Sequence, residues 1–146
     1  MTRLRRLDFE EIPEEYQYLF SDEYLGDRHI FRVWAHNPDV LEATLEYLNT
    51  LYDQLTPRRK ELVILTVAAT KDARYEWHQH VDIARDKGVT TEEMRAIGGD
   101  DFSPFDDEEF VLLQYAEAVA NGTVTDQIHA ALETAYSPSE IVAVGL

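Results

Sequence analysis

Hydrophobic residues recur along most of the chain with the three- and four-residue spacing of helices, and no segment alternates apolar and polar residues over strand length. In residues 57–70, Leu62, Leu65 and Ala69 follow this spacing, with further apolar residues between them. A helix that is apolar on nearly all sides belongs in the interior of a domain, so this segment is expected to be buried. The pattern predicts an all-α fold.

Capping signals mark the expected helix boundaries. Thr56 followed by Pro57 is a preferred pair for the N-cap and the first helical position. Thr90 with Glu93 has the spacing of a capping box, and Gly88 is a natural stop for the helix before it. The expected helices cover about residues 28–35, 38–54, 57–70, 72–87, 90–99, 106–121, 125–136 and 137 onward.

The last expected helix begins at Ser137-Pro138, and the chain ends at Leu146 without a C-terminal cap. Either the helix is truncated there or it is a single exposed turn, and we favour truncation. The chain shows no linker and no internal repeat, and 146 residues suit one globular domain. We therefore expect a single domain, residues 1–146, with a shortened final helix.

Net charge narrows the range of partners. The sequence has 13 Lys and Arg against 29 Asp and Glu, a formal net charge of −16. The electrostatic field of so negative a chain repels the phosphate backbones of nucleic acids, so no nucleic-acid partner is expected. Lysine occurs only at positions 60, 71 and 87. An acidic, lysine-poor surface favours a halophilic source, where salt screens self-repulsion; an ordinary acidic protein is the alternative.

Cysteine is absent, which excludes disulfides, thiolate catalysis and cysteine-ligated metal. No apolar run approaches the length of a membrane span, so no membrane partner is expected. The basic N-terminus lacks the apolar stretch of a secretory signal. These features predict a soluble, cytoplasmic protein.

Candidate chemistry concentrates in residues 72–87. On a helix, Ala73, Glu76, Trp77 and His80 lie on one stripe. A carboxylate four residues before an imidazole raises the histidine pKa and orients the ring, which suits acid–base chemistry near neutral pH. Trp77 would supply a dry wall beside the pair. The alternative is a solvated ion pair on an acidic helix.

Glu61 is the second candidate, because it lies in an otherwise apolar run. A carboxylate in such a place must find a partner or become protonated. Packing of its helix against the next one would bring Glu61 toward His80. The alternative places Glu61 in the exposed first turn of its helix, where a negative charge favours the helix dipole.

The segment RRKELVILTVAATKDARYEWHQHVDIARDKGVTTEEM, with FRVWAHNPDVL upstream, resembles the carboxymuconolactone decarboxylase family, which includes the alkylhydroperoxidase D-like proteins. The resemblance covers about residues 27–99. It implies a compact helical bundle that forms homo-oligomers, often trimers or hexamers, with sites near subunit contacts.

The alkylhydroperoxidase branch of this family pairs a glutamate with a C-x-x-C-x-x-x-H motif. On this chain the glutamate position is Glu61, the cysteine positions are Ala73 and Glu76, and the histidine is His80. Because both cysteines are missing, thiol peroxidase activity is not expected. The decarboxylase branch, which needs neither thiol nor cofactor, is the closer resemblance.

The resemblance favours a lyase that acts on a small carboxylated or lactone substrate without a cofactor or metal, although the sequence leaves open whether the chain is an enzyme. His80 would transfer the proton, while Glu61 and Glu76 orient it or stabilise its cation. Ala73, Arg74 and Trp77 would contact the substrate, whose carboxylate needs a cation. Candidates for that cation are Arg74 or, from another subunit, Arg32, Arg58 and Arg59.

Two other functions stay open. The two glutamates and His80 could bind a metal ion, since two carboxylates and one imidazole form a plausible ligand set. Alternatively, the protein is a non-catalytic oligomer that binds a small ligand or only assembles. A cleft around His80 would favour chemistry, and a filled core would favour assembly.

Overall fold

The computed structural model describes residues 3–22 and 24–146, and those residues form helices and connecting segments without a strand. The prediction of an all-α fold is confirmed. The predicted boundaries agree within two residues, apart from the last turn of one helix, which ends at Glu133 rather than Tyr136. The α-helices are α1 (His29–Trp34), α2 (Pro38–Tyr52), α3 (Pro57–Thr70), α4 (Arg74–Asp86), α5 (Thr91–Gly98), α6 (Asp107–Asn121), α7 (Asp126–Glu133) and α8 (Pro138–Gly145).

The capping residues begin the helices as predicted. The Thr56 hydroxyl accepts from a backbone N–H of α3, with Pro57 as first helical residue. Thr90 and Glu93 form a reciprocal capping box at α5. Gly122 ends α6 with φ +67°, a conformation that a residue without a Cβ adopts at no steric cost.

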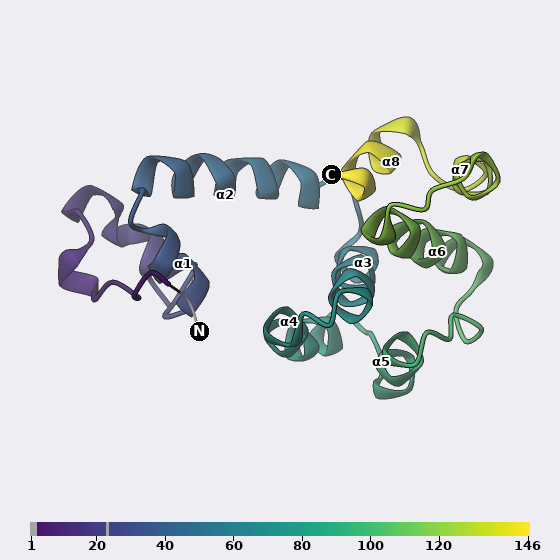
Figure 1. The fold of residues 1–146 in the computed structure, drawn as a ribbon, viewed down its shortest axis with the longest axis horizontal. Coiled ribbons are helices and arrows are strands. Elements are labelled where there is room, and N and C mark those ends of the chain that lie inside the picture. Colours follow the sequence, from purple (N-terminus) through teal and green to yellow (C-terminus); the bar gives the residue numbers. More distant parts are fainter. Residues whose placement is uncertain (1–2, 23) are drawn as a thin grey trace. The chain divides into compact units, whose positions relative to one another are not determined.

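The chain forms two compact units, residues 1–50 and 51–146, which are described separately (Figure 1). The first contains two 3₁₀-helices, η1 (Phe9–Glu11) and η2 (Glu14–Phe20), which the sequence pattern did not predict. Hydroxyls of η2 donate hydrogen bonds to carboxylates of α2. Its buried cluster consists of Leu7, Ile12, Leu19, Phe20, Leu25, Ala35, Leu41 and Leu45.

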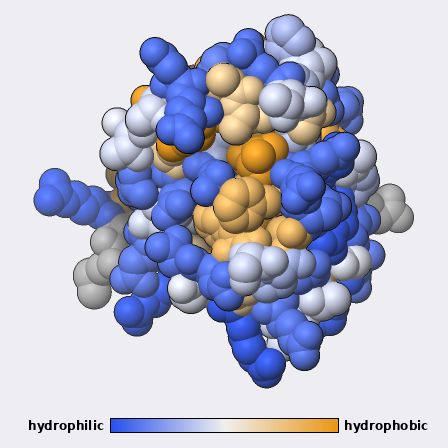
Figure 2. Space-filling model, turned by 90° about the vertical axis from the view of Figure 1, so that its right-hand side faces the viewer, coloured by the Kyte–Doolittle hydropathy of each residue, from blue (hydrophilic) through white to orange (hydrophobic). Residues whose placement is uncertain are grey.

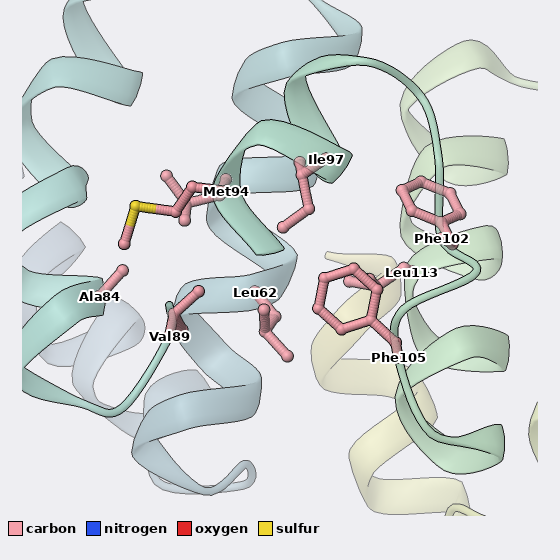
Figure 3. Packing of buried hydrophobic residues seen from close by; sticks show 9 residues of the cluster. Leu62, Ala84, Val89, Met94, Ile97, Phe102, Phe105 and Leu113 are labelled. Atoms are coloured by element: carbon pink, nitrogen blue, oxygen red, sulfur yellow. The ribbon is translucent and has the colours of Figure 1, made fainter. Parts of the chain in front are cut away.

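The second unit is built around α3, which packs against α4, α5 and α6 (Figure 1). Leu62 and Leu65 of α3 are fully buried, as the apolar pattern predicted. Figure 3 shows Leu62 within a cluster that includes Val89 before α5 and Phe105 before α6. Leu62 and Leu65 of α3 and Ala84 of α4 belong to this cluster, so it joins the two helices that carry the candidate residues.

The C-terminal part of this unit has its own buried cluster, formed by α6, α7 and α8. Ile141 and Val144 of α8 are buried in it, so α8 is more than a single exposed turn. The expectation of one domain with a truncated final helix stays a prediction.

Figure 2 shows one face of the molecule, on which hydrophilic side chains surround a smaller group of apolar ones. Within residues 3–22 and 24–146, no helix has both the length and the apolarity needed to cross a membrane.

Candidate active site

A tight turn between α3 and α4 positions the candidate residues. Asp72 has a φ of +47°, a left-handed conformation that Asp tolerates better than most residues. The Ala73 N–H donates to the carbonyl of Ala68 at 2.8 Å, which closes the turn. The chain therefore reverses within a few residues, and α4 packs back along α3 (Figure 1).

This reversal brings Glu61 of α3 and His80 of α4 together. Glu61 Oε2 lies 2.7 Å from His80 Nδ1, a hydrogen bond between residues 19 positions apart. Glu61 is 1% exposed, so it does not occupy an exposed first turn as one alternative proposed. A buried carboxylate requires compensating partners, and the imidazole is one of them.

Glu76 approaches the other side of the same ring. Its Oε1 lies 3.4 Å from His80 Nε2, at the predicted spacing of four residues. The Glu76 side chain is 44% exposed, whereas that of Glu61 is 2% exposed. The imidazole thus has a buried carboxylate at Nδ1 and a solvent-accessible one at Nε2.

This environment favours the charged form of His80. Burial lowers the pKa of the imidazole, but hydrogen bonds and charges from Glu61 and Glu76 outweigh burial and raise it to about 9. Both ring nitrogens can donate only when the ring is an imidazolium, which matches a carboxylate at each. The hydrogen bond to His80 in turn lowers the pKa of Glu76. At neutral pH the ring therefore carries a proton that it can donate.

The three predicted substrate contacts lie together in a separate hollow. Ala73, Arg74 and Trp77 line a cavity of about 230 Å³ at the start of α4. The remaining lining residues are Ala68, Ala69, Asp72 and Gly98. Neither His80 nor the two glutamates that contact it line this cavity. The structure therefore separates the predicted residues into two groups, a charged cluster of Glu61, Glu76 and His80 between α3 and α4, and a mostly apolar hollow at the start of α4.

Most arginines suggested as substrate cations have partners inside their own unit. Arg58 bonds to Glu93, to Glu109 and to a backbone carbonyl, an arrangement that joins α3, α5 and α6. Arg59 contacts Glu108 and the ring of Tyr136. These two arginines therefore serve the internal structure of the unit.

The remaining two arginine candidates differ from each other. Arg32 pairs with Asp27 in the first unit. Arg74 is highly exposed and pairs with Asp72 at the rim of the hollow. Of the cations considered from sequence, Arg74 is thus the one that lines this hollow.

Sequence reasoning missed two residues beside the Glu61–His80–Glu76 cluster, Lys60 and Tyr52. Lys60 Nζ lies 3.8 Å from Glu61 Oε1, the carboxylate oxygen that His80 does not contact. The same ammonium lies 4.7 Å from the centre of the Tyr52 ring. The sequence did contain a signal for Lys60: it directly precedes Glu61, the one carboxylate in an apolar run, and lysines are few in this chain.

The arrangement does not favour the metal alternative. In the part of the chain that the structure describes, no three His, Cys, Asp or Glu side chains are placed to hold one ion. The reason at this site is geometric, because Glu61 and Glu76 face different nitrogens of the His80 ring. The carboxylates therefore do not converge with one nitrogen on a common point.

The fold and the site together define an all-helical protein in which a buried glutamate on one helix holds a histidine on the next. The sequence profile of the carboxymuconolactone decarboxylase family matches residues 38–118, more than half of the 146-residue chain. The chain belongs to this family, as the resemblance predicted. The match includes α3 and α4 entirely. A search of curated proteins finds no match.

Proposed function

We propose that this protein is a cofactor-independent lyase that decarboxylates a small carboxylated or lactone substrate. The observation that supports the proposal most directly is the placement of His80, whose Nδ1 lies 2.7 Å from the buried Glu61 carboxylate and whose Nε2 faces the partly exposed Glu76. Membership of the decarboxylase family agrees with it. Disulfide-based peroxide reduction has no counterpart here, because Ala73 and Glu76 occupy the two cysteine positions and the sequence has no cysteine.

In the proposed step, the bond between the substrate carbon and its carboxylate breaks and releases CO₂. The electron pair stays on that carbon and is delocalised into a neighbouring carbonyl. His80 Nε2 then donates its proton to the carbon, and solvent returns a proton to the ring. Glu61 keeps the ring oriented and stabilises its charge, while the exposed Glu76 is able to move aside for the substrate.

The first prediction concerns His80 itself. Wild-type protein in molar KCl should convert carboxymuconolactone, with the reaction followed by ultraviolet absorbance. His80→Ala should lower kcat by roughly 10²- to 10⁴-fold, the usual contribution of a general acid. His78→Ala is the matched control, because His78 lies on the same helix and is exposed; its kcat should match the wild type. Equal activity of His80→Ala and wild type would remove His80 from the reaction.

A non-catalytic, ligand-binding function is the second candidate, and the hollow at Ala73, Arg74 and Trp77 favours it. This cavity is lined mainly by small or apolar groups and excludes the charged cluster of Glu61, Glu76 and His80. In a Trp34→Phe variant, Trp77 is the remaining tryptophan, so its fluorescence reports occupancy of the hollow. Saturable quenching by a lactone that is not converted, in an assembly shown by sedimentation to be a trimer or hexamer, would favour binding over catalysis.

A further inference from the structure

The Lys60 ammonium has fewer polar contacts than the Arg58 guanidinium on the same helix. Its ammonium carries three donors, yet the described residues offer it only the 3.8 Å ion pair with Glu61 and the face of Tyr52. No hydrogen bond joins this ammonium to a described residue. The side chain is 25% exposed. The ammonium therefore has N–H groups that are not used in hydrogen bonds to described residues.

Lys60 and His80 contact the same carboxylate, that of Glu61. The two oxygens of the Glu61 carboxylate contact different cations, Oε1 facing Lys60 and Oε2 facing His80. One buried carboxylate thus fixes the ammonium and the imidazolium as neighbours. Lys60 and His80 therefore share one buried counterion.

The charges of the cluster explain why the lysine matters for an anionic ligand. Glu61 and Glu76 carry two negative charges, and the protonated His80 and Lys60 carry two positive charges. The cluster is therefore locally neutral in a chain with a net charge of −16. Without the lysine it would be negative, and an approaching carboxylate would be repelled.

Tyr52 completes this environment. Its pKa is raised by burial first, and then by the negative charges of Glu76 and Glu61, so the phenol stays neutral and retains its proton. Its ring forms an aromatic wall against which the Lys60 ammonium lies.

We propose that Lys60 is the anion-binding residue of this site and that it holds the carboxylate of a small ligand beside His80, against the Tyr52 ring. This inference rests on the proposed function for the role of the site, but the binding itself does not require that a reaction follow. The ligand class is a small cyclic or linear carboxylate. Its neutral ester should bind much more weakly.

A ligand that cannot decarboxylate tests the binding separately from the reaction. The probe is 5-oxotetrahydrofuran-2-carboxylate, a saturated lactone acid, and its methyl ester is the neutral control. Calorimetry and the side-chain ¹⁵N resonances of His80 measure binding at constant salt. Wild-type protein should prefer the acid over the ester by about tenfold or more, the usual worth of a charge-assisted hydrogen bond.

Lys60→Met should abolish this preference, and Lys60→Arg should restore part of it because it keeps the charge. Lys87→Met is the matched control, because it removes one exposed lysine near the end of α4 and should leave the preference unchanged. Circular dichroism of each variant confirms folding, and Lys60→Gln replaces Lys60→Met if the latter does not fold. A preference for the acid that survives in Lys60→Met or Lys60→Gln, or no preference in wild type, overturns the inference.

The two proposals fail in different ways. Loss of acid binding in Lys60→Met without any turnover by wild type supports the anion site and contradicts the decarboxylase. Turnover by wild type with an unchanged KM in Lys60→Met supports the decarboxylase and contradicts the anion site.

Discussion

At the scale of single residues, His80 is defined by the difference between its two carboxylate neighbours. Glu61 is buried and fixed, so it sets the orientation and the charge of the ring. Glu76 is partly exposed and faces Nε2, so it stabilises the charge from the side nearer to solvent. A ring held in this way is suited to donate a proton in the neutral range rather than to accept one.

The raised pKa of His80 predicts a pH-dependent stability. The folded-state value is about 9, above the ordinary 6.5, so the protein gains stability from the charged ring below pH 6.5. That contribution decreases between pH 6.5 and 9 and is lost above the folded-state value. We expect the free energy of unfolding to fall by about 1–3 kcal/mol over this range.

Urea denaturation at a series of pH values measures this effect, with His80→Gln as the control. The variant should lack the decrease between pH 6.5 and 9 while keeping any contribution from other groups. Parallel curves for wild type and His80→Gln would show that the imidazole is not charged in the folded protein at neutral pH.

At the scale of helices, α3 carries both core residues of the second unit and the buried Glu61. Leu62 and Leu65 fill the interior from one helix that also supplies Glu61. The position of Glu61 therefore depends on the packing of its immediate neighbours. A loss of packing at Leu62 should weaken the fold and loosen the contact with His80 together.

Leu62→Ala should lower the free energy of unfolding by about 2–5 kcal/mol, because it leaves a cavity in a fully buried cluster. Val67→Ala is the control on the same helix, since Val67 is 38% exposed and its truncation should cost less than 1 kcal/mol. Chemical denaturation of both variants gives the comparison. Similar losses for the two would contradict the assignment of Leu62 to the core.

The helices could be predicted from sequence because their determinants are local. Caps such as Thr56 and Thr90 and the apolar spacing in α3 act within a few residues of the helices they define. The 3₁₀-helices η1 and η2 could not be found in this way, because short helices have no repeating apolar face. Their packing depends on contacts with α2, more than 20 positions away in the chain.

The candidate site was predictable only in part for the same reason. Glu76 and His80 are neighbours by helix geometry alone, and Glu61 was conspicuous as a charge in an apolar run. The contribution of Lys60 and Tyr52 depends on how a side chain near the start of α3 meets one at the end of α2, which no spacing rule specifies. Sequence therefore suggested the cluster of Glu61, Glu76 and His80 but not the lysine beside it.

At the scale of the whole molecule, the dominant property is its negative charge. A net charge of −16 on 146 residues produces self-repulsion that opposes the folded state. Ion pairs such as those of Arg58 offset this repulsion locally, but the chain has only 13 basic side chains. The free energy of unfolding should therefore depend on the salt concentration of the solution.

We expect the melting temperature at pH 7 to rise by several degrees between 0.1 and 1 M KCl, as the screening length falls from about 10 to about 3 Å. Thermal melts followed by circular dichroism measure the shift. The control is a series near pH 4.5, the isoelectric point, where little net charge is left to screen. If the melting temperature at pH 7 did not change with KCl concentration, charge self-repulsion would not limit the stability of this protein.

The contact between Glu61 and His80 also limits how this sequence can evolve. Losing the histidine alone would leave a carboxylate buried at 1% exposure with only the more distant Lys60 to compensate it. Breaking such a buried pair from one side costs more than replacing both members with apolar groups of similar size. Descendants that abandon the chemistry are therefore expected to lose both residues in quick succession, and a lineage that retains one has a strong reason to retain the other.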